Sequence, residues 1–130
     1  MNESLLRRVW IGAVIVLAAL IVVASLAPLP VLSNQTPSDK MGHYLAYLAL
    51  ALLGSGIASP AQLWRTMLRC FLLGASLELA QHWLTDQRTA EWGDLAANVA
   101  GILTAWLMAG WGRAGWGLRM AARLARRPGT

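Results

Sequence analysis

The sequence predicts an all-α membrane protein: a bundle of four transmembrane helices with both termini in the cytoplasm. Of its 130 residues, 57% are hydrophobic and only 13% are charged. Soluble domains carry about a quarter charged residues, because water must wet their surface. The apolar residues also fall into long runs instead of alternating faces. Much of the surface is therefore expected to face lipid.

Four apolar runs define the expected helices, each near the roughly 20 residues that cross a hydrocarbon core of about 30 Å. Arg7 and Arg8 precede the first run as they would in a signal peptide, but this run is longer than the usual apolar region of about 7–15 residues. We therefore expect an uncleaved first helix. Segments rich in proline and polar residues separate the runs. The expected helices cover residues 9–27, 41–58, 67–84 and 94–110.

The distribution of Lys and Arg predicts the orientation, because cytoplasmic loops carry the excess of these residues. Only Lys40 and Arg88 lie in the two segments expected outside. The other nine lie at the termini or between the second and third helices: Arg7, Arg8, Arg65, Arg69, Arg113, Arg119, Arg123, Arg126 and Arg127. Residues 1–112 are thus predicted to form one transmembrane domain, and residues 113–130 a basic cytoplasmic tail.

The tail is expected to contact anionic lipids of the inner leaflet, because its arginines recur at helical spacing. A basic interfacial helix and a disordered basic segment both fit this pattern. The net charge of +5 lies in the gaps between the apolar runs and in the tail. This placement favours a lipid surface and argues against nucleic acid as the partner.

The polar residues within the expected spans all fall near the outer face. Lys40, His43 and Tyr47 are spaced i, i+3, i+7 and share one helical face. The third helix carries polar residues in its outer half, and the fourth opens with an i, i+4 pair. The candidate ligand-binding residues are Asp39, Lys40, His43, Tyr47, Glu78, Gln81, Arg88, Asp94 and Asn98.

Glu78 is the residue most indicative of function, because an intramembrane carboxylate costs several kcal/mol unless it is paired or wetted. Lys40, His43 and Arg88 are its expected partners, with a protonated carboxyl as the alternative. Asn98 and Gln81 equally fit hydrogen bonds that hold helices together. Among the remaining polar residues, we expect His82 at a helix interface, Tyr44 facing lipid, and Asp86 and Glu91 as solvated loop charges.

Three segments, SDKMGHYLAY, ELAQHWLTDQR and DLAANVAG, carry these residues in order. Together they resemble the VanZ-like membrane proteins over about residues 38–110. That family's signature is Asp-Lys-x-x-His, then Glu-x-x-Gln with a following Arg, then Asp-x-x-x-Asn-x-x-Gly, which here ends at Gly101. The family's founding member is associated with resistance to the glycopeptide teicoplanin. The resemblance implies a multi-pass protein of the bacterial cytoplasmic (inner) membrane with a role at the cell envelope.

Three functions fit the residues. The first is a polar outer-leaflet pocket that binds an envelope- or lipid-linked anionic ligand, such as a cell-envelope precursor. The second is an intramembrane hydrolase or transferase with Glu78 or His43 as base. The third is a structural membrane subunit without a small ligand. Homo-oligomerisation would suit such a subunit, because four helices bury little surface. Binding is favoured. A metal site from His43, Glu78 and Asp94 or His82 lacks a tight ligand spacing, so no metal or cofactor is expected.

Overall fold

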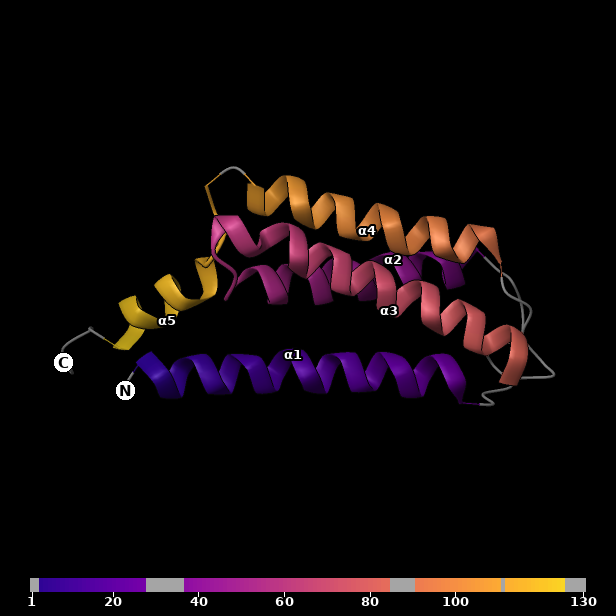
Figure 1. Ribbon diagram of the computed structural model, residues 1–130, viewed down its shortest axis with the longest axis horizontal. Coiled ribbons are helices and arrows are strands. Elements are labelled where there is room, and N and C mark those ends of the chain that lie inside the picture. The colour runs from indigo at the N-terminus through magenta and orange to yellow at the C-terminus, as the bar shows by residue number, and fades with distance from the viewer. Residues whose placement is uncertain (1–2, 28–36, 85–90, 111, 126–130) are drawn as a thin grey trace.

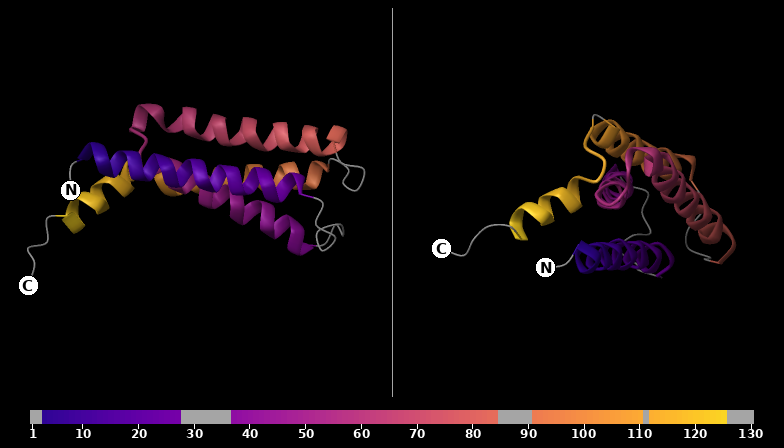
Figure 2. Two further views of the ribbon diagram at one scale, coloured as in Figure 1. Left: turned by 90° about the horizontal axis from the view of Figure 1, so that it is seen from below. Right: turned by 60° about the vertical axis from the view of Figure 1, so that its left-hand side comes forward.

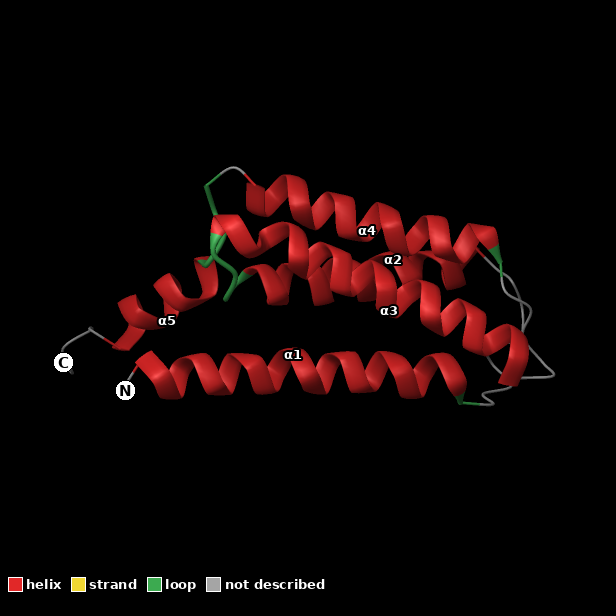
Figure 3. Ribbon diagram, in the orientation of Figure 1, coloured by secondary structure: helices red, strands yellow, loops and turns green. Residues whose placement is uncertain are grey.

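The computed structural model describes residues 3–27, 37–84, 91–110 and 112–125. Within these ranges the fold is entirely helical, without a β-strand (Figure 3). The described residues form five α-helices and one short 3-10 helix. They are α1 (Glu3–Leu26), α2 (Pro37–Ser55), η2 (Pro60–Gln62), α3 (Leu63–Leu84), α4 (Trp92–Gly110) and α5 (Trp116–Ala125).

The first four α-helices run up and down side by side, and the termini lie at the same end of the bundle (Figure 1). At a rise of 1.5 Å per residue, their 19 to 24 residues span roughly 28–36 Å. Figure 2 shows α1 along one side of the group formed by α2, α3 and α4. We call the end that carries the termini the terminal end, and the opposite one the far end.

Apolar side chains from all four long helices form the core, and two residues from different helices illustrate its packing. Ala51 of α2 and Ala105 of α4 are fully buried, so these two helices approach closely. At Gly101 of α4, the backbones of the two helices are in direct contact. A Cβ atom there would overlap the carbonyl oxygen of Tyr44 and lie 2.9 Å from the backbone nitrogen of Leu48. The pair α2 and α4 therefore forms the rigid centre of the bundle.

Of the described helices, one is long and apolar enough to cross a membrane by length and composition alone. This segment is Ser4–Leu26, of which little is buried. The other long helices carry polar residues in their sequences, among them Lys40, Glu78 and Asp94. The structure thus shows a helical bundle in which one described helix could cross a membrane, a coarser result than the four spans expected from the sequence.

The third and fourth long helices end at residues 84 and 110 as expected, whereas all four begin earlier than expected, α1 by the most, at Glu3. Helix α2 ends at Ser55 and not at residue 58. There Gly115 N, just before α5, donates to Ser55 O at 2.8 Å, and Leu118 N of α5 donates to Gly56 O at 3.2 Å. The expected loop around Arg65 is also wrong, since η2 leads directly into α3 at Leu63.

Candidate polar site at the far end

The N-terminal turns of α2 and α4 lie side by side at the far end, and an ion-pair network joins them. Lys40 Nζ donates a hydrogen bond to Glu91 Oε2 at 2.9 Å and lies 3.6 Å from Asp94 Oδ1. Lys40 precedes the expected span of residues 41–58. The hydrogen bond with Glu91 raises the pKa of Lys40 above its ordinary value. Gly93 leaves room for this side chain, because a Cβ there would lie 2.8 Å from Lys40 Cε.

His43 connects the same two helices one turn deeper. Its Nδ1 lies 3.1 Å from Asn98 Oδ1, and its Nε2 lies 3.7 Å from Asp94 Oδ2. An amide oxygen only accepts hydrogen bonds, so Nδ1 carries the proton that it donates to Asn98. Asn98 is 2% exposed and holds the ring in this orientation. In the neutral ring, Nε2 therefore presents its lone pair to Asp94.

The polar side chains beneath this network are almost completely buried. Besides Asn98, the buried members are Glu78, Gln81 and Asp94, with exposures of 6%, 3% and 7%, and Tyr47 at 2%. Gln81 Nε2 donates to Ser25 O at 2.8 Å, which ties α3 to α1. Five polar side chains buried at one end of so small a bundle mark that end as the candidate site.

Gly74 of α3 accommodates two of these side chains. A Cβ at this position would lie 3.1 Å from Tyr47 Cε1 and 3.2 Å from Asn98 Nδ2. The Tyr47 ring and the Asn98 amide are therefore packed against the backbone of α3. In this way α3 packs directly against the site.

A groove of about 220 Å³ opens beside the site between α1 and α2. Asp39, His43 and Tyr47 of α2 line it together with Ser25 of α1. Asp39, His43 and Asp94 also offer one ligand atom each within 4.8 Å of one another. Asp39 and His43 are partly exposed, so a small ligand can reach these two members of the trio from the groove.

Eight of the nine sequence-predicted site residues lie on α2, α3 and α4, between the far-end turns of these helices and the middle of the bundle. They are Asp39, Lys40, His43, Tyr47, Glu78, Gln81, Asp94 and Asn98; the ninth, Arg88, lies outside the described residues. Lys40, an expected partner of Glu78, forms its ion pairs with Glu91 and Asp94.

Three expectations about neighbouring residues were wrong. Glu91 is not a solvated loop charge, because Lys40 binds its carboxylate. The i, i+3 spacing of Glu91 and Asp94 was a usable signal that both lie on the same face. Tyr44 does not simply face lipid, since its hydroxyl donates to Thr104 Oγ1 at 3.2 Å. His82 is exposed and lies edge-on to Trp83, instead of between helices.

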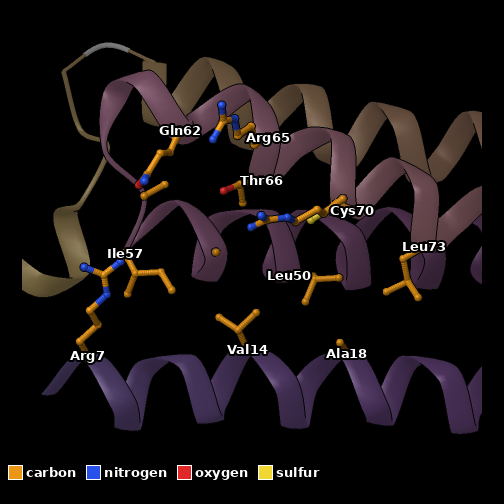
Figure 4. A pocket seen from close by; sticks show the side chains of 13 residues that line it. Arg7, Val14, Ala18, Leu50, Ile57, Gln62, Arg65, Thr66, Cys70 and Leu73 are labelled. Carbon is orange, nitrogen blue, oxygen red and sulfur yellow. The ribbon is translucent and has the colours of Figure 1, made fainter. Parts of the chain in front are cut away.

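A cavity of about 310 Å³ near α1 lies toward the terminal end, away from this site (Figure 4). Val14, Leu50 and Leu73 form part of its apolar wall, and Arg7 reaches it from α1. Cavity volume therefore does not identify the polar cluster, which is recognised by its buried charges and hydrogen bonds.

Similarity to known proteins does not assign a family to this geometry. Comparison with models of protein families, with curated proteins and with solved structures found no match for this chain. The resemblance to VanZ-like proteins therefore remains a prediction from the ordered residues themselves.

Proposed function

We propose that the protein crosses the bacterial cytoplasmic membrane four times, with its terminal end in the cytoplasm. The lengths of α1 to α4 support this, since each is close to the thickness of a hydrocarbon core, about 30 Å. Large apolar side chains are exposed along all four helices, for example Val16, Leu45, Leu72 and Leu107. In water such a surface would be unfavourable, whereas lipid accommodates it.

The arginines of the described chain support this orientation. They occur near the N-terminus, in the first turns of α3 and around α5, and all of these segments lie toward the terminal end (Figure 1). The positive-inside rule assigns that end to the cytoplasm. Arg123 of α5 is exposed, so α5 is proposed to bring positive charge to the anionic inner leaflet.

We propose further that the polar cluster at the far end binds an envelope- or lipid-linked anionic ligand, in keeping with the resemblance to VanZ-like proteins. The observation that carries this proposal is the burial of Glu78 and Asp94 among hydrogen-bonded neighbours that open onto a groove. Buried ionisable groups in membrane helices are costly, and for that reason they usually serve function. Lys40, with 42% of its side chain exposed, is available at the rim.

A structural subunit without a ligand is the alternative that specific contacts favour. The bonds from Gln81 to Ser25 and from Tyr44 to Thr104 join helices without any need for a ligand. Interhelical hydrogen bonds of this kind average about 0.6 kcal/mol in membranes. The two functions predict different phenotypes for a variant that removes a buried charge but keeps the shape of the side chain.

Glu78→Gln is the variant that separates them. If Glu78 takes part in ligand binding, the variant inserts and melts within a few degrees of the wild type, because the amide keeps the size of the carboxyl group. It then fails to complement a deletion strain challenged with teicoplanin and other envelope-active antibiotics. Full complementation by a well-folded Glu78→Gln protein would favour the structural subunit.

His82→Gln is the matched control, because His82 is exposed at the same end of the bundle. It should complement fully, whereas His43→Gln should behave like Glu78→Gln. Loss of complementation in His82→Gln as well would mean that any polar change at this end impairs the protein, and the site assignment would fall.

A further inference from the structure

When the imidazole of His43 is neutral, no proton lies between its Nε2 atom and the facing Oδ2 atom of Asp94. Asn98 Oδ1 fixes the Nδ1–H tautomer, which leaves the Nε2 lone pair directed at a carboxylate oxygen 3.7 Å away. Metal-binding histidines usually donate their other ring N–H to an oxygen in this manner, and that bond fixes the ring for coordination. The Asn98 contact thus prepares His43 as a ligand.

The distances suit a single cation. Two ligands that each lie about 2.1 Å from one ion are at most about 4.2 Å apart, and the 3.7 Å between His43 Nε2 and Asp94 Oδ2 already meets this limit. Asp39 supplies a third donor, with all three ligand atoms within 4.8 Å of one another. Because Asp39 is partly exposed, a small side-chain rotation can close the remaining distance.

A second, separate observation is the state of Asp94 itself. The residue is 7% exposed, and its Oδ1 atom accepts no hydrogen bond from the described residues. The Lys40 ammonium lies 3.6 Å away and donates instead to Glu91 at 2.9 Å. The other oxygen, Oδ2, faces His43 Nε2 at 3.7 Å, so a cation held between these two atoms would compensate the buried carboxylate.

The charge at the far end also favours a cation. In the described part of the chain it holds the carboxyl groups of Asp39, Glu78, Glu91 and Asp94, against Lys40 as the fixed positive charge. Such an excess of carboxyl groups attracts a divalent ion. An ion bound here would offset part of this negative charge and offer an open coordination position to the oxygen of a ligand.

We propose that Asp39, His43 and Asp94 bind one divalent transition-metal cation of the zinc or manganese class. One imidazole nitrogen with two carboxylates is a ligand set suited to these ions, whereas calcium and magnesium prefer oxygen alone. Three protein ligands leave a further position open, which the groove along Asp39 and His43 makes reachable. The inference that this ion receives an anionic ligand rests on the proposed function. The inference that the ion binds to the protein does not.

The test uses the full-length protein in detergent, stripped with a chelator and titrated calorimetrically with Zn²⁺ or Mn²⁺ alone. Wild type is expected to bind one ion per chain. Loss of a residue that only orients a metal ligand already weakens metal affinity about 10–100-fold, so Asp39→Asn and His43→Gln should each lose about 100-fold or more. Both residues are partly exposed, and circular dichroism checks that the variants fold.

Two further variants sharpen the result. His82→Gln removes an exposed histidine outside the trio and should bind the ion as wild type does. Lys40→Met removes the competing ammonium 3.6 Å from Asp94 and should bind it more tightly. Absence of one-site binding in wild type, or equal affinity in wild type and Asp39→Asn, would overturn the proposal. If metal binding fails while Glu78→Gln still abolishes complementation, the proposed function stands without the ion.

Discussion

At the scale of single residues, close packing of α2 against α4 depends on one glycine, Gly101. Gly101 lies against the backbone of Tyr44 and Leu48, where a Cβ atom has no space and no flexible neighbour to displace. Gly42 on α2 differs, because a Cβ there meets nothing within 4 Å. Gly42 is exposed and lies outside this interface, so it serves as the control for Gly101.

Gly101→Ala is expected to destabilise the protein by about 1–3 kcal/mol, the usual cost of overpacking. Gly42→Ala should leave stability unchanged or raise it by about 0.5–1 kcal/mol, because alanine suits a helix better than glycine. Unfolding in detergent measures both. Equal effects of the two substitutions would show that α2 and α4 are not in backbone contact at Gly101.

The ion pair between Lys40 and Glu91 is a second prediction at this scale. Its 2.9 Å contact is direct, but 42% of the Lys40 side chain is exposed, so solvent screens it. A double-mutant cycle with Lys40→Ala and Glu91→Ala should give a small favourable coupling that weakens as the salt concentration rises. Strict additivity of the two substitutions would mean that the side chains do not interact in the folded protein.

At the scale of elements, α5 is part of the bundle because two tryptophans hold it there. The rings of Trp10 on α1 and Trp116 on α5 meet edge to face, with centroids 5.4 Å apart. Trp10 Nε1 donates to Leu53 O at 2.7 Å, and Trp116 Nε1 donates to Leu52 O at 3.2 Å. Gly117 leaves the space that the Trp10 ring occupies. The end of α2 thus supplies the acceptors to which α1 and α5 bind.

Trp10→Phe keeps a ring but removes the donor to Leu53, which should cost about 0.5–1.5 kcal/mol. It should also loosen α5, so that trypsin cleaves more quickly after Arg119, whose guanidinium donates to Ala114 O at 2.6 Å in the intact turn. Trp83→Phe is the control, since Trp83 is 75% exposed. Equal tryptic rates in wild type and Trp10→Phe would contradict the docking role.

At the scale of the whole molecule, the termini share one end with the turn between α2 and α3, while α4 begins at the other (Figure 1). Ser59 lies in that turn and is exposed, and Trp92 opens α4 with 86% exposure. A bundle that crosses the membrane four times separates these two positions across the bilayer. A protein anchored by α1 alone leaves them on the same side.

Single cysteines at Ser59 and Trp92, placed in a Cys70→Ser background, distinguish these topologies. In intact cells, an impermeant maleimide should label Trp92→Cys, and it should label Ser59→Cys only after the membrane is permeabilised. The buried native Cys70 is removed so that it adds no signal. Labelling of both positions in intact cells, or of neither, would contradict the four-span orientation.

The sequence by itself determined the number and order of the long helices, because apolar runs, prolines and glycines act locally. It also predicted that Lys40, His43 and Asp94 gather at one end, since helical spacing fixes the depth of each residue once the direction of its helix is known. The helical state of residues 116–125 was one of two alternatives, and the structure selects it.

Only the tertiary structure decided which side chains meet across helices. Lys40 binds Glu91 because the first turn of α4 lies beside α2, and no spacing within one helix specifies that neighbour. Helix α2 ends at Ser55, where the backbone N–H of Gly115, just before α5, binds the Ser55 carbonyl. Both contacts join residues more than 50 positions apart, so they depend on the rotation and packing of whole helices, which local patterns do not encode.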